Sequence, residues 1–367
     1  MEDEFMKKQL VSCVLAAVLT AAAITGCKQP EPAGGQTAQA QDGQTAGNES
    51  ASEDKGGKAQ VITMTFALAE NSPHHKAGLE FARLVEEKTN GAYKVEVYPN
   101  SALASGNQLE AIQMVQNGSI SCGWVSPPVQ TAIEPSLNAL SIPWLWKDTE
   151  TIDATLQPGT DVDKELNRLM NAKGYEIIGY AENGYRELTN SVREIRTPAD
   201  MKNLKFRVIG SPMLLDVFKA MGANPVDLNF GELFTALQQK TVDGQENPIS
   251  TAIIPQRFYE AQKYLTVWNY SYEPHPLEFN KKLWDSFDPE TQEIFRECAA
   301  AACTLQKKLA REALEADMQT LRDAGVVITE LTDEEKQPFK EIAAAAAEKS
   351  IQDYDQALVE ALYNANK

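Results

Sequence analysis

From Val61 onward, strand-like and helix-like stretches alternate, and this alternation constrains the fold more than any other feature of the chain. Residues 61–68 form an apolar stretch typical of a strand, and Ser72-Pro73 then offers an N-cap and a proline at the first helical position. Apolar residues follow at helical spacing until Asn90-Gly91, and residues 93–98 are the next predicted strand. A strand, a helix and a strand in this order predict parallel pairing with a right-handed crossover.

The same pattern continues along the rest of the chain. Further strands are predicted within residues 120–125, 175–180, 206–209 and 223–228, and helices within 108–117, 212–222 and 230–239. After Pro289, residues 290–324 contain neither Gly nor Pro, which predicts one long helix. Alanines and charges interrupt any heptad in that run, so a coiled coil is disfavoured and a helix that spans two lobes is the better interpretation. The 367 residues suffice for two α/β lobes.

The N-terminus has the features of an export signal. Lys7 and Lys8 precede an apolar run over residues 10–24, which is short and rich in alanine, as in a signal peptide. The run ends in Ile24-Thr25-Gly26-Cys27, which resembles a bacterial lipobox, so we expect lipidation at Cys27. The alternative is an uncleaved N-terminal anchor. Because Glu2-Asp3-Glu4 does not suit a signal, Met6 is a candidate for the true start.

Residues 28–60 contain no Val, Ile, Leu, Met or aromatic residue. Such a segment cannot bury a core, so we predict a disordered tether after the 1–27 signal, with a typical reach of about 30 Å.

The formal net charge of −18 argues against a nucleic-acid partner. Cys122, Cys298 and Cys303 show no metal-binding spacing and are expected as small core or helix residues. We predict no metal and no cofactor.

Arg207 is the most suggestive candidate for binding chemistry. It lies in an apolar strand of the kind that parallel sheets bury on both faces, and a buried arginine needs an anionic partner. Gly210-Ser211-Pro212 follows, which places Arg207 near the carboxyl end of its strand, where open α/β sheets bind ligands. The planar guanidinium matches a carboxylate with two hydrogen bonds. Its anionic partner is either the carboxylate of a ligand or a nearby Glu or Asp of the protein in a structural salt bridge, and the sequence does not decide between the two.

The remaining polar candidates each have a plainer interpretation. Arg186 follows the Asn183-Gly184 turn and would be a surface arginine at a strand edge, while Asn247 before Pro248 would be loop chemistry. His74 and the adjacent His75 would be surface or capping residues. His275 either lines a pocket or packs where the chain crosses between lobes. No nucleophile elbow, phosphate-binding loop or HExxH motif occurs, so the sequence indicates no enzyme.

Several signatures in the right order resemble the extracytoplasmic solute-binding proteins of tripartite ATP-independent periplasmic (TRAP) transporters, of the C4-dicarboxylate-binding type. The resemblance runs from about Val61 to at least Phe295. Its markers include residues 81–91, 98–101, 197–202, 206–208 and 221–226, and the most specific is the run 232–248, which ends in Asp-Gly-Gln-Glu-Asn-Pro. The sequence departs from the family at Leu103-Ala104-Ser105-Gly106, where members often carry Leu-Gly. The resemblance therefore defines neither the loop that faces the distal end of the ligand nor the substrate.

The resemblance implies a two-lobed α/β fold of the periplasmic-binding-protein type, with hinge strands and a long lobe-spanning helix. It places the carboxylate clamp on Arg207, a second ligand arginine on Arg186, the ligand amide on Asn247 and a pocket aromatic on Phe230. Further ligand-facing positions are expected at Glu70, Trp124, Ser126, Ser211, Tyr272, His74 and His275. We expect lobe I over 61–183 and 273–312, and lobe II over 184–272 and 313–367.

The sequence therefore predicts a lipid-anchored, extracytoplasmic, monomeric receptor without catalytic activity. It would bind a dicarboxylate, a sugar acid or a keto acid and deliver that anion to TRAP membrane subunits. Two alternatives are a secreted lyase or hydrolase, which would need an acid/base pair that the sequence does not show, and a lipoprotein sensor that uses the same fold to signal.

Overall fold

The computed structural model describes residues 58–367, which belong to one compact unit. The predicted signal peptide, the lipidation site at Cys27 and nearly all of the predicted tether lie outside the described residues. The first strand begins at Gln60, the last residue of the predicted tether. None of the helices in residues 58–367 is both long enough and apolar enough to cross a membrane.

The first sheet has five strands in the order β2-β1-β3-β10-β4. These strands are β1 (Gln60–Thr65), β2 (Tyr93–Tyr98), β3 (Cys122–Trp124), β4 (Tyr175–Tyr185) and β10 (Tyr272–Asn280). Strand β1 pairs in parallel with β2 and β3, while β10 runs antiparallel to β3 and β4. Helix α1 (Pro73–Lys88) connects β1 to β2, and its N-cap is Ser72, as the sequence predicts.

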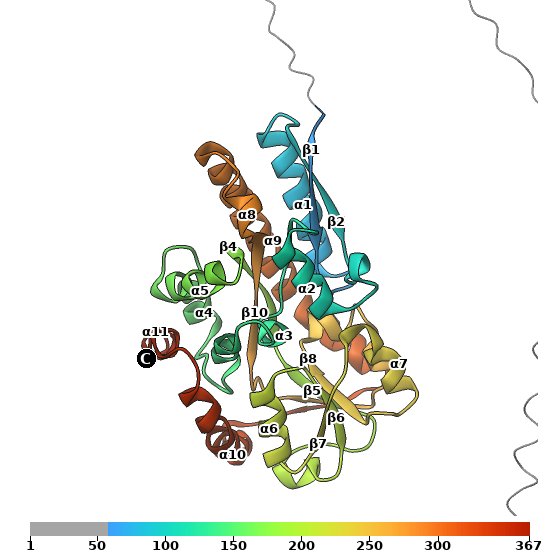
Figure 1. Cartoon of the computed structure of the whole chain (residues 1–367). Coiled ribbons are helices and arrows are strands. Elements are labelled where there is room, and N and C mark those ends of the chain that lie inside the picture. The colour runs from blue at the N-terminus through green and yellow to red at the C-terminus, as the bar shows by residue number, and fades with distance from the viewer. Residues whose placement is uncertain (1–57) are drawn as a thin grey trace, which may run out of the picture. The chain divides into compact units, whose positions relative to one another are not determined.

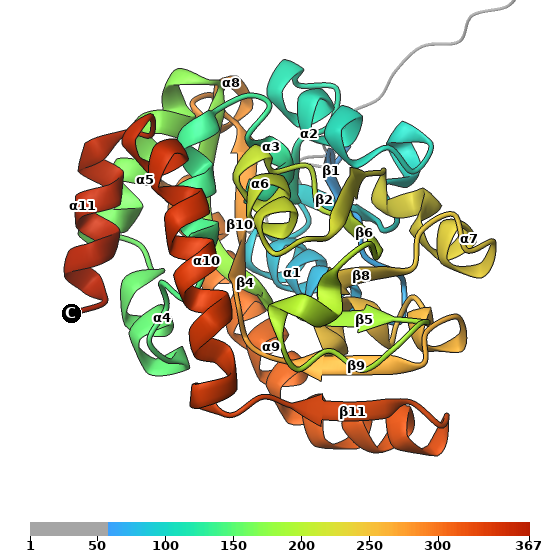
Figure 2. The ribbon, with the colours of Figure 1, turned by 90° about the horizontal axis from the view of Figure 1, so that it is seen from below.

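The second sheet has six strands in the order β11-β9-β5-β8-β6-β7, several of which lie side by side in Figure 2. These strands are β5 (Glu187–Asn190), β6 (Lys205–Val208), β7 (Asn224–Asp227), β8 (Gly244–Asn247), β9 (Tyr264–Val267) and β11 (Val327–Glu330). Strand β6 pairs in parallel with β7 and β8, and β5 is antiparallel to both β8 and β9. Helix α6 (Pro212–Ala220) begins after the N-cap Ser211, as predicted.

Two extended segments carry the chain between the two sheets (Figure 1), and a third passage runs from β10 through helix α9 (Pro289–Asp323) to β11. The chain leaves the first sheet where β4 ends at Tyr185 and enters the second where β5 begins at Glu187, with Arg186 between them. It returns between the end of β9 at Val267 and the start of β10 at Tyr272. This architecture of two sheets joined by extended segments confirms the predicted fold class.

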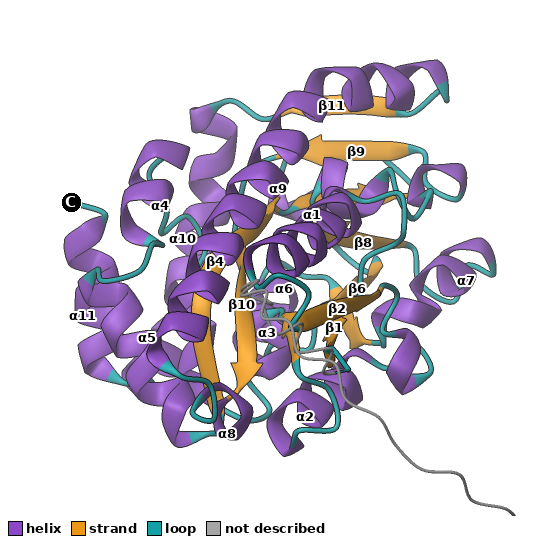
Figure 3. Ribbon diagram, turned by 90° about the horizontal axis from the view of Figure 1, so that it is seen from above, coloured by secondary structure: helices purple, strands orange, loops and turns teal. Residues whose placement is uncertain are grey.

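Helix α9 (Pro289–Asp323) is the long helix that the sequence predicts. Asp288 caps it, with its carboxylate accepting from the amide of Thr291 at 2.9 Å. The helix packs against α1 and β4 of the first sheet and against the short helix η5 (Ile249–Ile253), and it leads into β11 of the second sheet. Figure 3 shows it running beside α1. It therefore contacts both halves of the molecule, as a lobe-spanning helix must.

The remaining helical elements cover the two sheets. They are η1 (Ala102–Ala104), α2 (Gln108–Asn117), α3 (Pro127–Gln130), η2 (Pro135–Ser141), α4 (Thr149–Thr155), α5 (Asp161–Ala172), η3 (Pro198–Met201), η4 (Phe230–Glu232), α7 (Leu233–Gln238), η6 (Phe258–Glu260), α8 (Lys281–Trp284), α10 (Asp333–Gln352) and α11 (Gln356–Ala365). Helix α10 packs on α6, whereas α11 packs on α4, α5 and η2. The last helix thus sits with elements of predicted lobe I, although residues 313–367 were assigned to lobe II. The lobe boundaries stay a prediction.

The core consists of two clusters of buried apolar residues. One joins the α5 and β4 region to β6 and α6, and the other joins β1, α1 and α9 to α7 and η5. Cys122, Cys298 and Cys303 are buried free thiols within the core, which confirms their expected role as small core residues.

Candidate ligand-binding site

Two small cavities adjoin each other where the two sheets meet. The Arg207 cavity has a volume of about 230 Å³, and the much smaller Arg186 cavity shares Gln108 and Phe230 with it. The Arg207 cavity is lined by Asn107, Gln108, Leu109, Val129, Ala132, Arg207, Gly210, Asp227, Leu228, Asn229 and Phe230. The Arg186 cavity is lined by Ala67, Leu68, Gln108, Ser126, Asn183, Arg186, Ile209, Phe230, Asn247, Glu273 and His275.

The four principal residues of the sequence prediction therefore come together, and Ser126 and His275 join them. Each half of the molecule contributes. Gln108 and Ser126 belong to elements around the first sheet, whereas Arg207, Phe230 and Asn247 belong to the second. A ligand that filled these cavities would touch both halves.

Arg207 is 2% exposed and has an unusual set of contacts. Its Nε donates to the carbonyl of Leu228 at 2.9 Å, and its guanidinium lies over the ring of Phe230 at 5.9 Å. Its Nη1 is buried without a hydrogen-bond partner. Burial lowers the pKa of Arg207 to about 10, although nearby acids, Glu246 foremost, oppose that shift.

No carboxylate of residues 58–367 forms an ion pair with Arg207. The structural salt bridge that the sequence left open is thus not formed. A buried guanidinium with an unmet donor is costly, because the lost hydration is not replaced. A ligand carboxylate that accepted from Nη1 would supply the missing partner.

Arg186 is fully buried, so the alternative of a surface arginine is wrong. It forms ion pairs with Glu246 and Glu273, and its Nη2 also donates to the carbonyl of Glu246 at 2.6 Å and to Oδ1 of Asn247 at 3.2 Å. Burial alone would lower the pKa of Arg186, but the two glutamates outweigh that effect and raise it above its usual range.

Glu246 and Glu273 are site residues to which the sequence analysis assigned no role. Glu246 also accepts from the hydroxyl of Tyr270 at 2.7 Å and from the amide of Ile209 at 3.1 Å. Burial favours a higher pKa for Glu273, but Arg186 and then His275 hold it well below its usual range. No local signal in the sequence marks these two acids as buried, because β8 (Gly244–Asn247) is polar and β10 mixes polar with apolar residues.

A chain of hydrogen bonds runs from Glu273 to helix α9. His275 Nε2 faces Glu273 at 3.3 Å, His275 Nδ1 faces His74 Nε2 at 3.0 Å, and His74 Nδ1 faces Nε2 of Gln306 at 3.4 Å. The amide nitrogen of Gln306 can only donate, so His74 Nδ1 accepts and His74 Nε2 carries the proton. His275 Nδ1 then accepts and its Nε2 donates to Glu273. Each contact of the chain then has one donor and one acceptor.

This chain changes the interpretation of His74. The side chain is fully buried, so a surface or capping role is wrong for it. Burial, and then the neighbouring His275, holds the pKa of His74 well below its usual value.

Two further donors complete the surroundings of Glu273, namely the hydroxyl of Ser126 at 2.5 Å and the amide of Asn183 at 2.7 Å.

Four other predicted ligand-facing residues, Glu70, Trp124, Ser211 and Tyr272, do not line either cavity. Glu70 is exposed, and Trp124 packs against Phe66 and His74. Ser211 caps α6 and donates to Asn138 at 2.6 Å. Tyr272 donates to Glu182 at 2.9 Å and lines a separate cavity of about 360 Å³ beside α9. Contact of these residues with a ligand stays a prediction.

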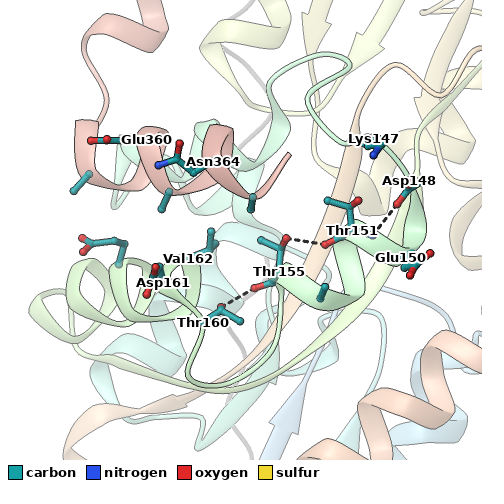
Figure 4. A pocket seen from close by; sticks show the side chains of 15 residues that line it. Lys147, Asp148, Glu150, Thr151, Thr155, Thr160, Asp161, Val162, Glu360 and Asn364 are labelled. Atoms are coloured by element: carbon teal, nitrogen blue, oxygen red, sulfur yellow. Dashed lines mark hydrogen bonds between the residues drawn. The ribbon is translucent and has the colours of Figure 1, made fainter. Parts of the chain in front are cut away.

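A larger open hollow of about 940 Å³ lies between α4, α5 and α11 (Figure 4). Its charged side chains are Lys147, Asp148, Glu150, Asp161, Glu165 and Glu360. Because acids dominate this set, the hollow does not suit an anion. In the part of the chain that the structure describes, no cluster of His, Cys, Asp and Glu could hold a metal ion.

Comparison with known proteins agrees with this geometry. A family model described as "Bacterial extracellular solute-binding protein, family 7" matches residues 64–353. The chain is 34% identical over 274 residues to the 2,3-diketo-L-gulonate-binding periplasmic protein of Escherichia coli K12, an alignment that covers 74% of this chain and 82% of that protein.

Solved structures match equally broadly. A TRAP periplasmic solute-binding protein from Ralstonia eutropha, with bound (S)-2-acetolactate, has 31% identity and a TM-score of 0.78 over 83% of this chain and 98% of its own. The sugar-acid-binding protein of Advenella mimigardefordensis, in complex with galactonate, has 32% identity and a TM-score of 0.76 over 84% of this chain and 99% of its own.

Proposed function

Because the chain belongs to family 7 of the bacterial extracellular solute-binding proteins, the receptors that deliver organic acid anions to TRAP transporters, we propose that Arg207 holds its ligand's carboxylate. The observation that carries this proposal is the buried Nη1 of Arg207, which has no protein partner and belongs to a side chain that lines a cavity between the two sheets. A carboxylate there would gain charge-assisted hydrogen bonds in a water-poor site.

Asn247 would assist from the adjoining cavity, and Arg186 would hold it in position. Glu246 and Glu273 fix the guanidinium of Arg186, and Nη2 of Arg186 in turn donates to Asn247. A site whose groups are already held in place loses little entropy when a ligand binds. Phe230 forms the wall that the two cavities share and lies under the guanidinium of Arg207.

Closure of the two lobes around the ligand is the second part of the proposal. Several hydrogen bonds link predicted lobe II to predicted lobe I, and two of them lie near the Arg207 cavity. Asn229 donates to the carbonyl of Gly106 at 3.1 Å, and Ser211 donates to Asn138 at 2.6 Å. The first of these joins the Leu103–Gly106 loop, whose sequence departs from the resembled pattern, to Asn229, which lines the Arg207 cavity. A ligand that binds both lobes would favour this closed arrangement.

We also propose that the receptor acts outside the cytoplasm as a monomer, anchored through a lipid on Cys27, and that it leaves its ligand chemically unchanged. The signal-like segment and Ile24-Thr25-Gly26-Cys27 support the anchor. The absence of a known catalytic motif in the sequence supports binding without turnover.

The test is a thermal-shift screen against mono- and dicarboxylic acids, sugar acids and keto acids, followed by calorimetry on the best ligand. We expect one ligand per protein, and an unchanged NMR spectrum of that ligand after long incubation. Conversion of the ligand would overturn the receptor assignment. Binding combined with failure to support uptake by reconstituted TRAP membrane subunits would favour the lipoprotein sensor.

A further inference from the structure

We infer that the ligand is a hydroxylated acid with a single carboxylate, rather than a dicarboxylate. This inference rests on the proposed function and concerns the same two cavities. It depends on which charged groups line the cavities and on which of them already have partners.

Only two side chains that line the cavities, Arg186 and Arg207, are those of lysine or arginine. Each of the three nitrogens of Arg186 already donates to a protein oxygen, and two buried carboxylates compensate its charge. His275 already has a partner, because its Nε2 lies 3.3 Å from the carboxylate of Glu273.

Arg207 is therefore the one lining cation in residues 58–367 without an ion-pair partner. Its Nε is used by Leu228, and its Nη1 has no partner. That arrangement has room for one carboxylate. A second carboxylate on the same ligand would find no free cation among the lining residues, and the exposed acid Asp227 would face it.

The rest of the Arg207 cavity is lined with neutral amides and one acid. The amides are Asn107, Gln108 and Asn229, and the acid is Asp227. The carboxylate of Asp227 lies against Gly210, where a β-carbon would come within 3.2 Å of both of its oxygens. Because glycine has no β-carbon, position 210 lets the carboxylate of Asp227 pack closely against the backbone.

An amide offers both a donor and an acceptor, and a carboxylate offers acceptors only. Hydroxyl groups satisfy both kinds of partner, whereas a second ligand carboxylate would be repelled by Asp227. The volume of about 230 Å³ is below that of pockets for drug-sized ligands, so the ligand is a small metabolite. A short polyhydroxylated acid fits each of these requirements.

The experiment is calorimetry with D-galactonate, succinate and galactitol as probes. Galactitol keeps the hydroxyls of galactonate but lacks its carboxylate. We expect galactonate to bind at least tenfold more tightly than succinate and galactitol to bind too weakly to measure. If succinate binds more tightly than galactonate, the inference is overturned and the receptor assignment stands. If neither acid nor any other member of the organic acid panel binds, the proposed function itself fails.

Asp227→Asn tests the role of the acid directly. The substitution replaces an acceptor for ligand hydroxyls and removes the repulsion of a second carboxylate, so the ratio of galactonate to succinate affinity should fall about three- to tenfold. Asp216→Asn is the matched control, because it removes the same charge from an exposed position of α6 that lines neither cavity. A ratio that is unchanged in Asp227→Asn, or equally changed in the control, would overturn the role assigned to Asp227.

Discussion

At the scale of single residues, the two buried arginines illustrate two different uses of one side chain. Arg186 is compensated by two glutamates and belongs to the structure of the crossing between the sheets, whereas Arg207 is buried with an unmet donor. The physical consequence is opposite for the two. Replacing Arg186 would leave two buried carboxylates without their cation. Replacing Arg207 in the free protein would remove a buried charge whose Nη1 has no hydrogen-bond partner.

Arg207→Lys and Arg207→Ala should both remain folded and lose ligand affinity. Removing one partner of a buried, hydrogen-bonded pair costs about 2–5 kcal/mol, so we expect Arg207→Ala to bind about 30-fold to more than 1,000-fold more weakly. Lysine keeps the charge but loses the planar fork, and it should also bind poorly. Calorimetry measures the affinity, and the exposed Arg193→Lys is the control. Wild-type affinity in Arg207→Lys would refute the clamp.

Arg186→Met should lower the free energy of unfolding by about 3–5 kcal/mol, because Glu246 and Glu273 would be left buried without their cation. Urea denaturation followed by circular dichroism measures this loss. The double variant Arg186→Met/Glu246→Gln should recover part of it, because one of the two uncompensated charges is then gone. A single variant as stable as the wild type would show that the ion pairs contribute nothing to the fold.

At the scale of elements, strand β10 concentrates the buried ionisable groups. All nine of its residues are buried, and they include Glu273, His275 and Glu278. Nε2 of Gln130 donates to Glu278 at 2.7 Å, but Oε1 of Glu278 is buried without a partner. Burial raises the pKa of Glu278 to about 8, so it is protonated in the folded protein at neutral pH.

This protonation makes stability depend on pH. Above about pH 4.5 the unfolded chain releases the proton of Glu278 while the folded protein keeps it, so this group's contribution to stability falls as pH rises from about 4.5 towards 8. Glu187, whose pKa burial raises to about 7, acts in the same direction. His74 acts in the opposite direction near pH 6.5, because the folded state resists its protonation. The wild-type profile alone is therefore a sum of opposing effects.

Glu278→Gln isolates the contribution of Glu278. Glutamine has the same shape, still accepts from Gln130 and never ionises. We expect the variant to differ little from the wild type near pH 5 and to become more stable than it by roughly 2–4 kcal/mol near pH 9. Denaturation midpoints across this range measure the difference. A difference that does not grow with pH would show that Glu278 is ionised or solvated in the folded state.

Local signals explain how well the elements could be predicted. The cap Ser72, the helices predicted within 108–117 and 212–222 and the long run after Pro289 depend on residues close to one another in the chain, and all four predictions are confirmed. The ion pairs of Arg186 join residues 60 and 87 positions apart, so no local pattern shows them. The burial of His74 likewise depends on β10 and α9, two elements far along the chain.

At the scale of the whole molecule, the candidate site lies where two sheets meet, and the chain joins these sheets through two extended crossings and through helix α9. Each crossing places a charged or polar group next to the cavities. Arg186 lies between β4 and β5, and Glu273 follows the return from β9. A change of angle between the sheets would therefore move Glu273 relative to Glu246, with Arg186 between them. In the proposed function, this arrangement would link ligand binding at Arg207 and Asn247 to the angle between the two sheets.

The position of the whole molecule in the cell is the subject of the last prediction. If Ile24-Thr25-Gly26-Cys27 is a lipobox, Cys27→Ser should move the protein from the membrane fraction to the soluble fraction, or leave it unprocessed. A buried acyl chain contributes about 0.8 kcal/mol per CH₂, and stable anchoring needs more than one chain, so loss of the lipidated cysteine removes the whole anchor. Ligand affinity should not change, because the cavities lie within residues 67–275.

Cell fractionation followed by mass spectrometry of the mature N-terminus measures this outcome. Cys13→Ser is the matched control, because it changes a cysteine inside the predicted signal peptide and should leave the protein on the membrane. An unmodified N-terminus at another position in the wild-type protein would contradict the lipobox. Retention of the Cys27→Ser variant on the membrane after cleavage would show that the protein is held there by another contact.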